Sequence, residues 1–425
     1  MSELLQRTPA PAALAARRAV SWLFLLNGML FGTWVSRIPM VQERHELTHG
    51  ALGVALLGMA LGALVAMPLS GWASARLGSR RVAAFWTLVY ASMLPSLAFA
   101  PGVHWLKAGL FLFGAGHGGL DVAMNGQAVL VERRYHRPIM SSFHALFSAG
   151  GLAGAALGAG MAWLAVPVET HFVTVATLLG GTVVLIALRP LLPDDPVDRR
   201  SENKVSSNGG RLQASGSGKS GLAAISAADL RRLIALGALA FCIMMGEGAM
   251  ADWSGLFLKQ VTGAGDGLAS AGYAAFSLAM MLGRIAGDSL TLRLGPECLV
   301  RGSGVLAAAG LLLALVTAHP YAAVLGFAAV GAGFATVIPQ VFSAAGRVKE
   351  ISPGLALATV TTLGYGGFLL GPPLIGFVAE GIGLRGALGL VVLTSACAVT
   401  LAAALRTRRS DEITSQVQAS QRLSV

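Results

Sequence analysis

Acidic and polar residues interrupt two strongly apolar stretches of this sequence. In GAGHGGLDVAMNGQAVLVERR, residues 114–134, His117, Asp121 and Asn125 are spaced by four residues, so on a helix they share one face. MMGEGAMADWSG, residues 244–255, carries Glu247 and Asp252. An ionised carboxylate facing hydrocarbon costs about 2.5–3.5 kcal/mol, so acids in such stretches line cavities, form pairs or bind protons. Both stretches are therefore candidates for proton transfer or solute binding.

We assign proton coupling to Asp121 and Glu247, because desolvation favours the protonated form of a carboxyl and allows it to exchange a proton. The alternative is a structural acid, held for Asp121 by hydrogen bonds to His117, Asn125 or a neighbouring span. Asp252 lies five residues, ~7.5 Å of helix, nearer the outside than Glu247. We predict that Asp252 closes an outer gate with Arg37.

The elements that position these residues are predicted from composition. Hydrophobic residues make up 55% of the 425 positions and charged residues 12%, which indicates a membrane protein. About 20 apolar residues are needed to cross ~30 Å of hydrocarbon as a helix. The predicted fold is all-α, with twelve transmembrane helices at 19–38, 52–73, 82–100, 106–130, 141–164, 170–189, 232–257, 269–291, 300–318, 321–345, 354–378 and 384–405.

The net charge of +11 has a topological explanation. With a cytoplasmic N-terminus, twelve spans leave only Arg37, Arg44, Lys107, Lys259 and Arg385 of the 31 basic residues outside, and Arg284 inside a span. This bias predicts that both termini lie in the cytoplasm. The pattern lacks the basic, aromatic-rich patches typical of nucleic-acid binding.

The chain divides into two similar halves. A cytoplasmic tail (1–18) precedes a first six-helix bundle (19–189), a flexible linker (190–231), a second bundle (232–405) and a second tail (406–425). A shift of 217 residues superimposes RLG at 76–78 on RLG at 293–295 and GAG at 114–116 on GAG at 331–333. Such repeats are typical of transporters whose solute site lies between two pseudo-symmetric bundles.

Nucleotide, metal and cofactor sites are not predicted. GAGHGG lies within an apolar span with no preceding strand, and GSGKS in the linker has Gln213 where a phosphate-binding loop needs its first glycine. Cys242, Cys298 and Cys397 are scattered, without the spacing of a zinc site or a disulfide framework.

GWASARLGSRR, residues 71–81, resembles the signature loop of the major facilitator superfamily, with Gly71, Arg76, Gly78, Arg80 and Arg81 in matching places. It departs at Ala75, where that loop usually has aspartate. The counterpart in the second half, from Gly283, carries its acid at Asp288. The resemblance implies a cytoplasmic gate made by Arg76, Arg80, Arg81, Arg284 and Asp288.

A narrower resemblance rests on WVSRIP (34–39), DVAMN (121–125), SSFHALFSAGGLAGA (141–155) and EGAMADWSGLFL (247–258). Together they resemble the bacterial inner-membrane MosC/YbjJ-like branch, which is distantly similar to fucose:proton symporters. In those symporters, an acid followed four positions later by asparagine takes part in proton coupling on the fourth span. Asp121 and Asn125 match this spacing.

Other polar and aromatic residues could line the cavity. The predicted set is Asn27, Trp34, His117, Asn125, His144, Ser148, Trp253, Gln340, Thr362 and Tyr365. Each has an alternative role, as a hydrogen bond between helices or, for the tryptophans, at the membrane interface.

The predicted function is proton-coupled secondary transport of a small sugar- or cyclitol-like solute by alternating access, with a monomer as the working unit. One alternative is proton-antiport efflux of amphipathic or cationic compounds, and another is a membrane sensor that does not transport. An enzyme is not expected, because Ser148 and His144 share a face but no oxyanion-hole motif accompanies them.

Overall fold

A computed structural model describes residues 11–135, 139–182, 191–192, 226–348 and 353–406. These residues form helices and short connections, with no strand among them. The helices of the first half are α1 (Pro11–Arg44), α2 (His49–Leu77), α3 (Ser79–Ala98), α4 (Val103–Tyr135), α5 (Met140–Trp163) and α6 (Val168–Thr182). Those of the second half are α8 (Ala227–Gln260), α9 (Asp266–Leu294), α10 (Pro296–Thr317), α11 (Pro320–Phe334), α12 (Val337–Ala345), α13 (Pro353–Ala387), α14 (Gly389–Leu401) and the short η3 (Ala402–Leu405).

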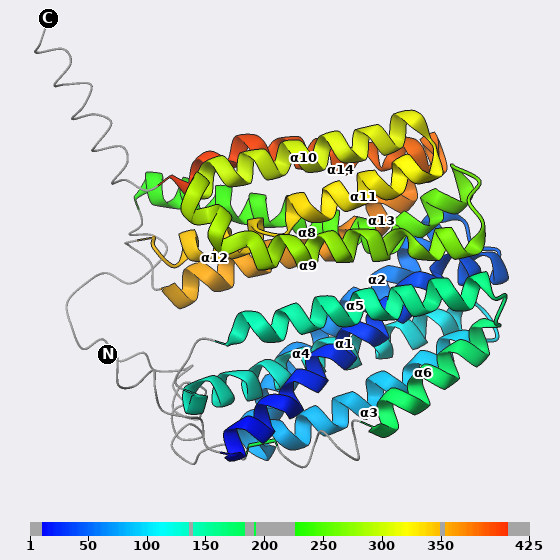
Figure 1. Cartoon of the computed structure of the whole chain (residues 1–425), viewed down its shortest axis with the longest axis horizontal. Coiled ribbons are helices and arrows are strands. Elements are labelled where there is room, and N and C mark those ends of the chain that lie inside the picture. Colours follow the sequence, from blue (N-terminus) through cyan, green and yellow to red (C-terminus); the bar gives the residue numbers. More distant parts are fainter. Residues whose placement is uncertain (1–10, 136–138, 183–190, 193–225, 349–352, 407–425) are drawn as a thin grey trace, which may run out of the picture.

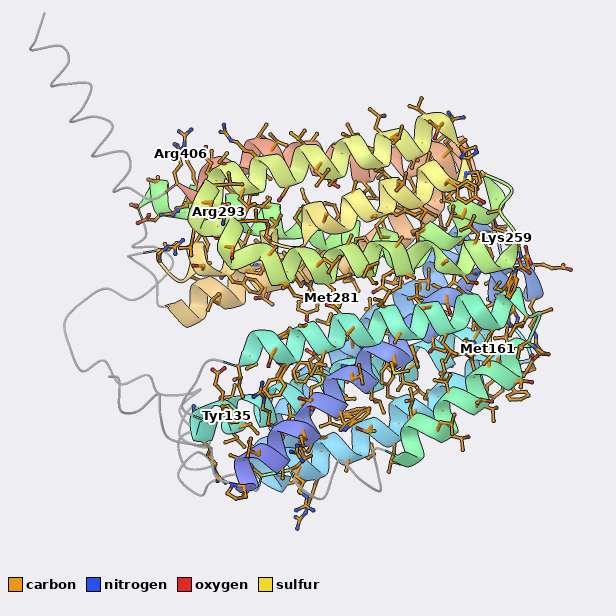
Figure 2. All side chains as sticks on the ribbon, viewed as in Figure 1. Tyr135, Met161, Lys259, Met281, Arg293 and Arg406 are labelled. Carbon is orange, nitrogen blue, oxygen red and sulfur yellow. The ribbon has the colours of Figure 1, made fainter. Side chains whose placement is uncertain are left out.

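The helices form two bundles, α1–α6 and α8–α14, that lie side by side (Figure 1). The main seams between them are α5 against α9 and α2 against α13. We call the end that carries residues 45–48 and 261–265 the closed end, because the bundles meet there, whereas their ribbons diverge toward the opposite end. Lys259 marks the closed end, and Tyr135, Arg293 and Arg406 mark the opposite end (Figure 2).

The predicted internal repeat is visible in the backbone. Gly78 (φ 90°) separates α2 from α3, and Gly295 (φ 74°) separates α9 from α10. Both glycines adopt a positive φ, which only glycine adopts at no steric cost, and both amides bond the carbonyl four residues earlier. The two RLG motifs therefore form the same turn in each half.

Glycines also permit the same helix crossings in both bundles. A Cβ added to Gly114 of α4 would lie 1.9 Å from the carbonyl oxygen of Met59 in α2. One added to Gly331 of α11 would lie 2.2 Å from the carbonyl oxygen of Phe276 in α9. The partners, like the glycines, are separated by the repeat of 217 residues, so the GAG motifs are equivalent packing sites, as small residues often are in membrane helices.

The apolar composition agrees with a membrane protein. Eight helical segments of the described residues are long and apolar enough to cross a membrane. Large apolar side chains such as Leu292, Leu325 and Phe377 are exposed, as expected of helices that lipid surrounds. Each predicted span coincides at least partly with a helix, and the count of twelve crossings stays a prediction.

Several predicted boundaries differ from the structure. α1 begins at Pro11, inside the predicted tail, and α8 begins at Ala227, inside the predicted linker, because the Ser226 hydroxyl accepts a hydrogen bond from the Asp229 amide and caps that helix. The predicted tenth span is divided into α11 and α12. α13 extends past the predicted end at residue 378 as far as a break at Gly383 (φ 74°), and the predicted start of the last span at residue 384 coincides with that break. Much of the linker and the tail after Arg406 lie outside the described residues.

Candidate functional site

The predicted polar face of α4 is present, and its members have different partners. Asn125 donates from Nδ2 to the Asp121 carboxylate at 3.2 Å and to the Asp121 carbonyl at 2.8 Å. His117 Nδ1 lies 2.7 Å from Oδ1 of Asn27 in α1. Asp121 is thus oriented by its own helix, whereas His117 joins α4 to α1.

Tyr365 of α13 is within electrostatic range of carboxyl groups from both bundles. Tyr365 interacts electrostatically with Asp121 of the first bundle and with Glu247 of the second. Glu247 Oε1 is buried and has no hydrogen-bond partner among the described residues. An unpaired buried carboxylate oxygen is costly, so the arrangement suits a protonated acid or one that awaits a ligand.

Arg284 of α9 reaches across the bundle seam. Its Nη1 donates to Ser148 Oγ of α5 at 2.8 Å, and it interacts electrostatically with Glu247 and His144. In this conformation Arg284 therefore joins the two bundles beside Glu247, and its predicted role in a cytoplasmic gate stays a prediction. The side chain of Asp288, its predicted companion, lies outside the described residues.

Other members of the predicted cavity set lie elsewhere. Trp34 and Trp253 are fully buried, and Trp34 packs between Phe113 and Phe172 inside the first bundle. Gln340 donates to the hydroxyl of Thr291 within the second bundle, at 2.7 Å. Trp34 and Gln340 thus act as packing and interhelical groups here, and Thr362 is exposed on α13.

The predicted outer pair is not formed. Arg37 donates to His171 Nδ1 at 3.2 Å and to the Val166 carbonyl at 3.0 Å, both in its own bundle. These contacts tie α1 to α6 and to the connection that precedes α6. Asp252 is not a hydrogen-bond or ion-pair partner of Arg37 in this conformation, and both hydrogen bonds of Arg37 stay within the first bundle.

A different set of residues joins the bundles at the closed end. Lys259 lies 2.7 Å from both Glu43 of the first bundle and Asp266 of its own. Gln260 donates to Gln42 at 2.7 Å and lies 2.8 Å from His49. This network closes the seam between the ends of α1 and α8, and beside it a recess of about 520 Å³ follows the seam.

Glu380 of α13 adds a second inter-bundle contact by capping α2. Its Oε1 accepts from the Thr48 hydroxyl at 2.7 Å and from the Gly50 amide at 3.2 Å. The first amides of a helix lack internal acceptors and carry partial positive charge, so a carboxylate there is favourable. A carboxylate of one bundle therefore satisfies the helix N-terminus of the other only while the end is closed.

Glu380→Ala is expected to favour opening of this end. Losing two partly exposed hydrogen bonds to a carboxylate is worth about 1 kcal/mol, or about a fivefold rise in the open population. Spin labels at Glu46 and Gly265 in bilayer nanodiscs would measure it as a larger long-distance fraction. Glu169→Ala removes an acid whose partner, Arg44, lies in the same bundle, and serves as the matched control. Equal distributions in the two variants would contradict the latch.

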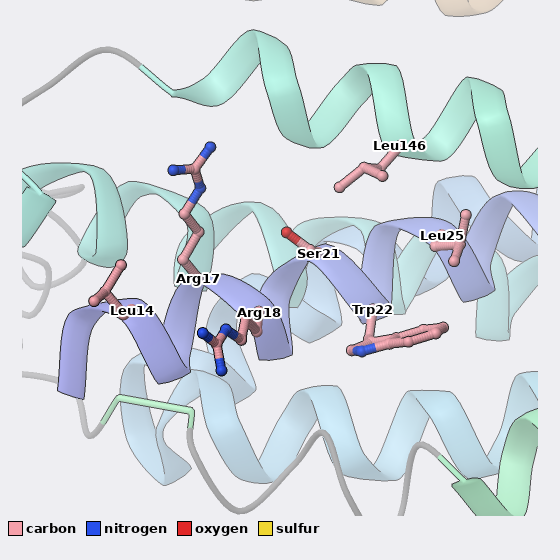
Figure 3. Close-up of a pocket in the computed structure, with 7 residues that line it drawn as sticks. All are labelled: Leu14, Arg17, Arg18, Ser21, Trp22, Leu25 and Leu146. Carbon is pink, nitrogen blue, oxygen red and sulfur yellow. The ribbon is translucent and has the colours of Figure 1, made fainter. Parts of the chain in front are cut away.

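At the opposite end, the predicted arginine cluster is exposed. Arg76 stacks over Trp72 at 4.5 Å, and Arg80 and Arg81 begin α3 at the surface. Their predicted gate role stays a prediction for the other conformation. A recess of about 380 Å³ near this end is lined by Leu14, Arg17, Arg18, Ser21, Trp22, Leu25 and Leu146 (Figure 3). Asp121, Glu247, Arg284 and Tyr365 do not line this recess.

Lys259, Glu380 and Tyr273 were missed by the sequence analysis. Tyr273 of α9 packs edge-on to Phe31 and interacts electrostatically with Glu247 and Arg284. The sequence analysis placed Lys259 on the outer side without a partner. Glu43 follows the first predicted span on the same side, so an ion pair between the two could have been predicted. Glu380 gave no comparable signal, because its partners are a helix N-terminus far away in the sequence.

Comparison with known proteins identifies the family. Residues 20–352 match the model of the Major Facilitator Superfamily. The chain belongs to this superfamily. The chain is therefore a multi-pass membrane transporter of some solute, in a family of transporters and not of enzymes, as the sequence predicted.

Relatives and solved structures of the superfamily resemble the chain over most of its length. It is 36% identical to the uncharacterized transporter y4wD of Sinorhizobium fredii, over 92% of this chain and 98% of that protein. It is also 36% identical to the membrane protein MosC of Rhizobium meliloti, over 88% of this chain and 86% of that protein. A variant of the nucleoside transporter NupG has the same fold, with TM-score 0.71, 16% identity and coverage of 92% and 98%. FucP in an outward conformation also has this fold, with a TM-score of 0.59 and 16% identity over 93% of this chain and 100% of that one.

Proposed function

We propose that this superfamily member is a proton-coupled transporter that moves a small hydroxylated solute, working as a monomer in a bacterial inner membrane. The observation that supports this most directly is that Asp121 and Glu247, from opposite bundles, both interact electrostatically with Tyr365. A proton gained or lost at either acid changes the charge between the bundles. Such a change favours one arrangement of the bundles over the other, which is what coupled alternating access requires.

The solute class is inferred from the groups around these acids. Asn27, His117, Asn125 and Tyr365 supply amide, imidazole and hydroxyl groups that recognise hydroxyls. NupG, which has the same fold, is named a nucleoside transporter, so this architecture accommodates a hydroxylated ligand of the size of a nucleoside. A sugar- or cyclitol-like compound suits these groups.

Solute flux in proteoliposomes tests the proposal. Purified protein should accumulate a radiolabelled polyol or sugar when the lumen is alkaline relative to the bath, and a protonophore should abolish accumulation. Flux that ignores the proton gradient would leave a facilitator, and extrusion of cationic dyes would favour the antiport alternative. Binding without flux in either direction would indicate a sensor.

The closed end is proposed to face away from the cytoplasm, so that the structure is the inward-facing form. Alkaline phosphatase is active only outside the cytoplasm, so a fusion within residues 193–225 should be inactive and one after Glu46, at the closed end, active. The physical reason is the excess of basic residues on the linker side. Measuring both fusions in the same cells supplies the control, and the reverse pattern would invert the orientation.

A further inference from the structure

The contact between Arg284 and Ser148 joins the bundles beside an unpaired acid. Arg284 Nη1 donates to Ser148 Oγ across the α5–α9 seam at 2.8 Å. Glu247, on the adjacent α8, has a buried Oε1 with no hydrogen-bond partner among the described residues, although Arg284 interacts with it electrostatically. A guanidinium has five donors in a fixed fork and prefers a carboxylate to a hydroxyl, so its bond to Ser148 needs a reason.

We propose that Arg284 is a switching residue, which binds Ser148 while Glu247 is protonated and moves to Glu247 when that proton leaves. This inference rests on the proposed function and names the residue through which protonation acts. With Glu247 protonated, the pair carries one positive charge, and the arginine gains most from a polar group on the facing bundle. After Glu247 releases its proton to water at the open end, the pair is neutral, and a carboxylate–guanidinium bond replaces the contact with Ser148.

The position of Ser148 makes this exchange mechanically relevant. Ser148 is buried on α5, and its hydroxyl also donates to the carbonyl of His144, one turn earlier, at 3.3 Å. The same two helices meet at the closed end, where a Cβ on Gly267 would lie 3.0 Å from the Cβ of Trp163. α5 and α9 thus pack along much of their length. Ser148 lies in the first half of α5 and Arg284 in the second half of α9, so their contact is on the side of the ends that diverge in Figure 1. Releasing Ser148 removes a bond across the seam where the bundles separate.

Other titratable groups lie near this pair, and their contributions to any pH dependence must be distinguished from that of Glu247. They are His144 on α5, Tyr273 on α9, Asp252 on α8, Tyr365 on α13 and, through Tyr365, Asp121 on α4. His144 is exposed and interacts electrostatically with Arg284, so it is the main competing source of pH dependence.

Distance measurements across the α5–α9 seam test the switch. Spin labels at Met140 and Leu292, near the diverging ends of α5 and α9, are placed in full-length protein whose three free cysteines are replaced by serine. In nanodiscs without solute, the ratio of the two distance populations should change by about tenfold between weakly acidic and weakly alkaline buffer. Glu247→Gln, which imitates the protonated acid, should hold the acidic distribution at both pH values.

Matched variants separate the switch from general damage. Arg284→Gln should remove the pH dependence and Arg284→Lys should retain part of it. Ser148→Ala should hold the alkaline distribution at both pH values, because the bond across the seam is then absent whether or not Glu247 is protonated. His144→Gln should titrate like the unmodified protein. The inference is overturned if Glu247→Gln still titrates normally, or if Arg284→Gln leaves the distribution unchanged.

The same preparations distinguish failure of the switch from failure of the proposed function. Flux in proteoliposomes that depends on a proton gradient, together with a normally titrating Glu247→Gln variant, rejects only the switch. Flux that ignores the gradient rejects proton coupling itself, whatever the labels report.

Discussion

Asp121→Asn is expected to abolish accumulation of solute against its gradient, reducing the internal-to-external ratio to about one, while exchange of solute across the membrane continues. Asparagine keeps an oxygen that can accept the hydrogen bond now donated by Asn125, so the α4 face should stay intact. What it loses is the titratable proton, and without a proton carried in each cycle the gradient cannot drive uptake. Counterflow and gradient-driven uptake, measured in the same proteoliposomes, separate the two effects.

Two further variants show whether the effect of Asp121→Asn is specific to this acid. Glu132→Gln changes an acid on the same helix, whose carboxylate accepts from the amides of Ile139 and Met140 away from the site, and should leave accumulation unaltered. Glu247→Gln should resemble Asp121→Asn if both acids share the proton. If Asp121→Asn folds and still accumulates solute, Asp121 is a structural acid and the proton site lies on α8.

Gly114→Ala and Gly331→Ala are expected to prevent folding or to lower the melting temperature severely. Each added Cβ would lie about 2 Å from a backbone carbonyl of the neighbouring helix, 1.9 Å and 2.2 Å respectively, where no side chain can move aside. Overpacking typically costs 1–3 kcal/mol and occasionally more, and forcing apart two backbones belongs to the upper part of that range. Yield of monodisperse protein and thermal unfolding in detergent measure the loss.

Gly160→Ala in α5 and Gly302→Ala in α10 are the controls. Neither position has a heavy atom within 4 Å of the added Cβ, so alanine should be tolerated or slightly stabilising there. Similar melting temperatures for Gly114→Ala and Gly160→Ala would contradict the close approach of α2 and α4.

The fold could be predicted largely from local information. Apolar length and charge bias depend on the sequence alone, and the RLG and GAG repeats indicated the two-fold arrangement because the same turn and the same helix crossing need the same residues. The ends of helices were less predictable. α1 extends beyond its apolar segment. The division between α11 and α12 at Ala335 and Thr336 did have a sequence signal, because Pro339 lacks the amide that would bond the Ala335 carbonyl, but the predicted span did not use it.

The candidate site was predictable where its members share one helix. Asp121 and Asn125 meet through a four-residue spacing, which the sequence states directly. Partners on different helices were not predictable in the same way. Arg37 binds a backbone carbonyl and a histidine in its own bundle, and a carbonyl acceptor has no sequence signature. Arg284 was assigned to a gate because spacing along a helix defines a face but not which neighbour that face meets.

The cap that Glu380 provides for α2 makes a single amide proton a reporter of the transport cycle. The Gly50 amide is bonded to Glu380 only when the bundles meet at the closed end, whereas the Ala51 amide bonds Thr48 of its own segment in either state. Hydrogen exchange at Gly50 should therefore proceed through opening of that end, at a rate set by the fraction of time spent open. Deuterium uptake there, referenced to Ala51, would measure how often the closed end opens, without a label or a known solute.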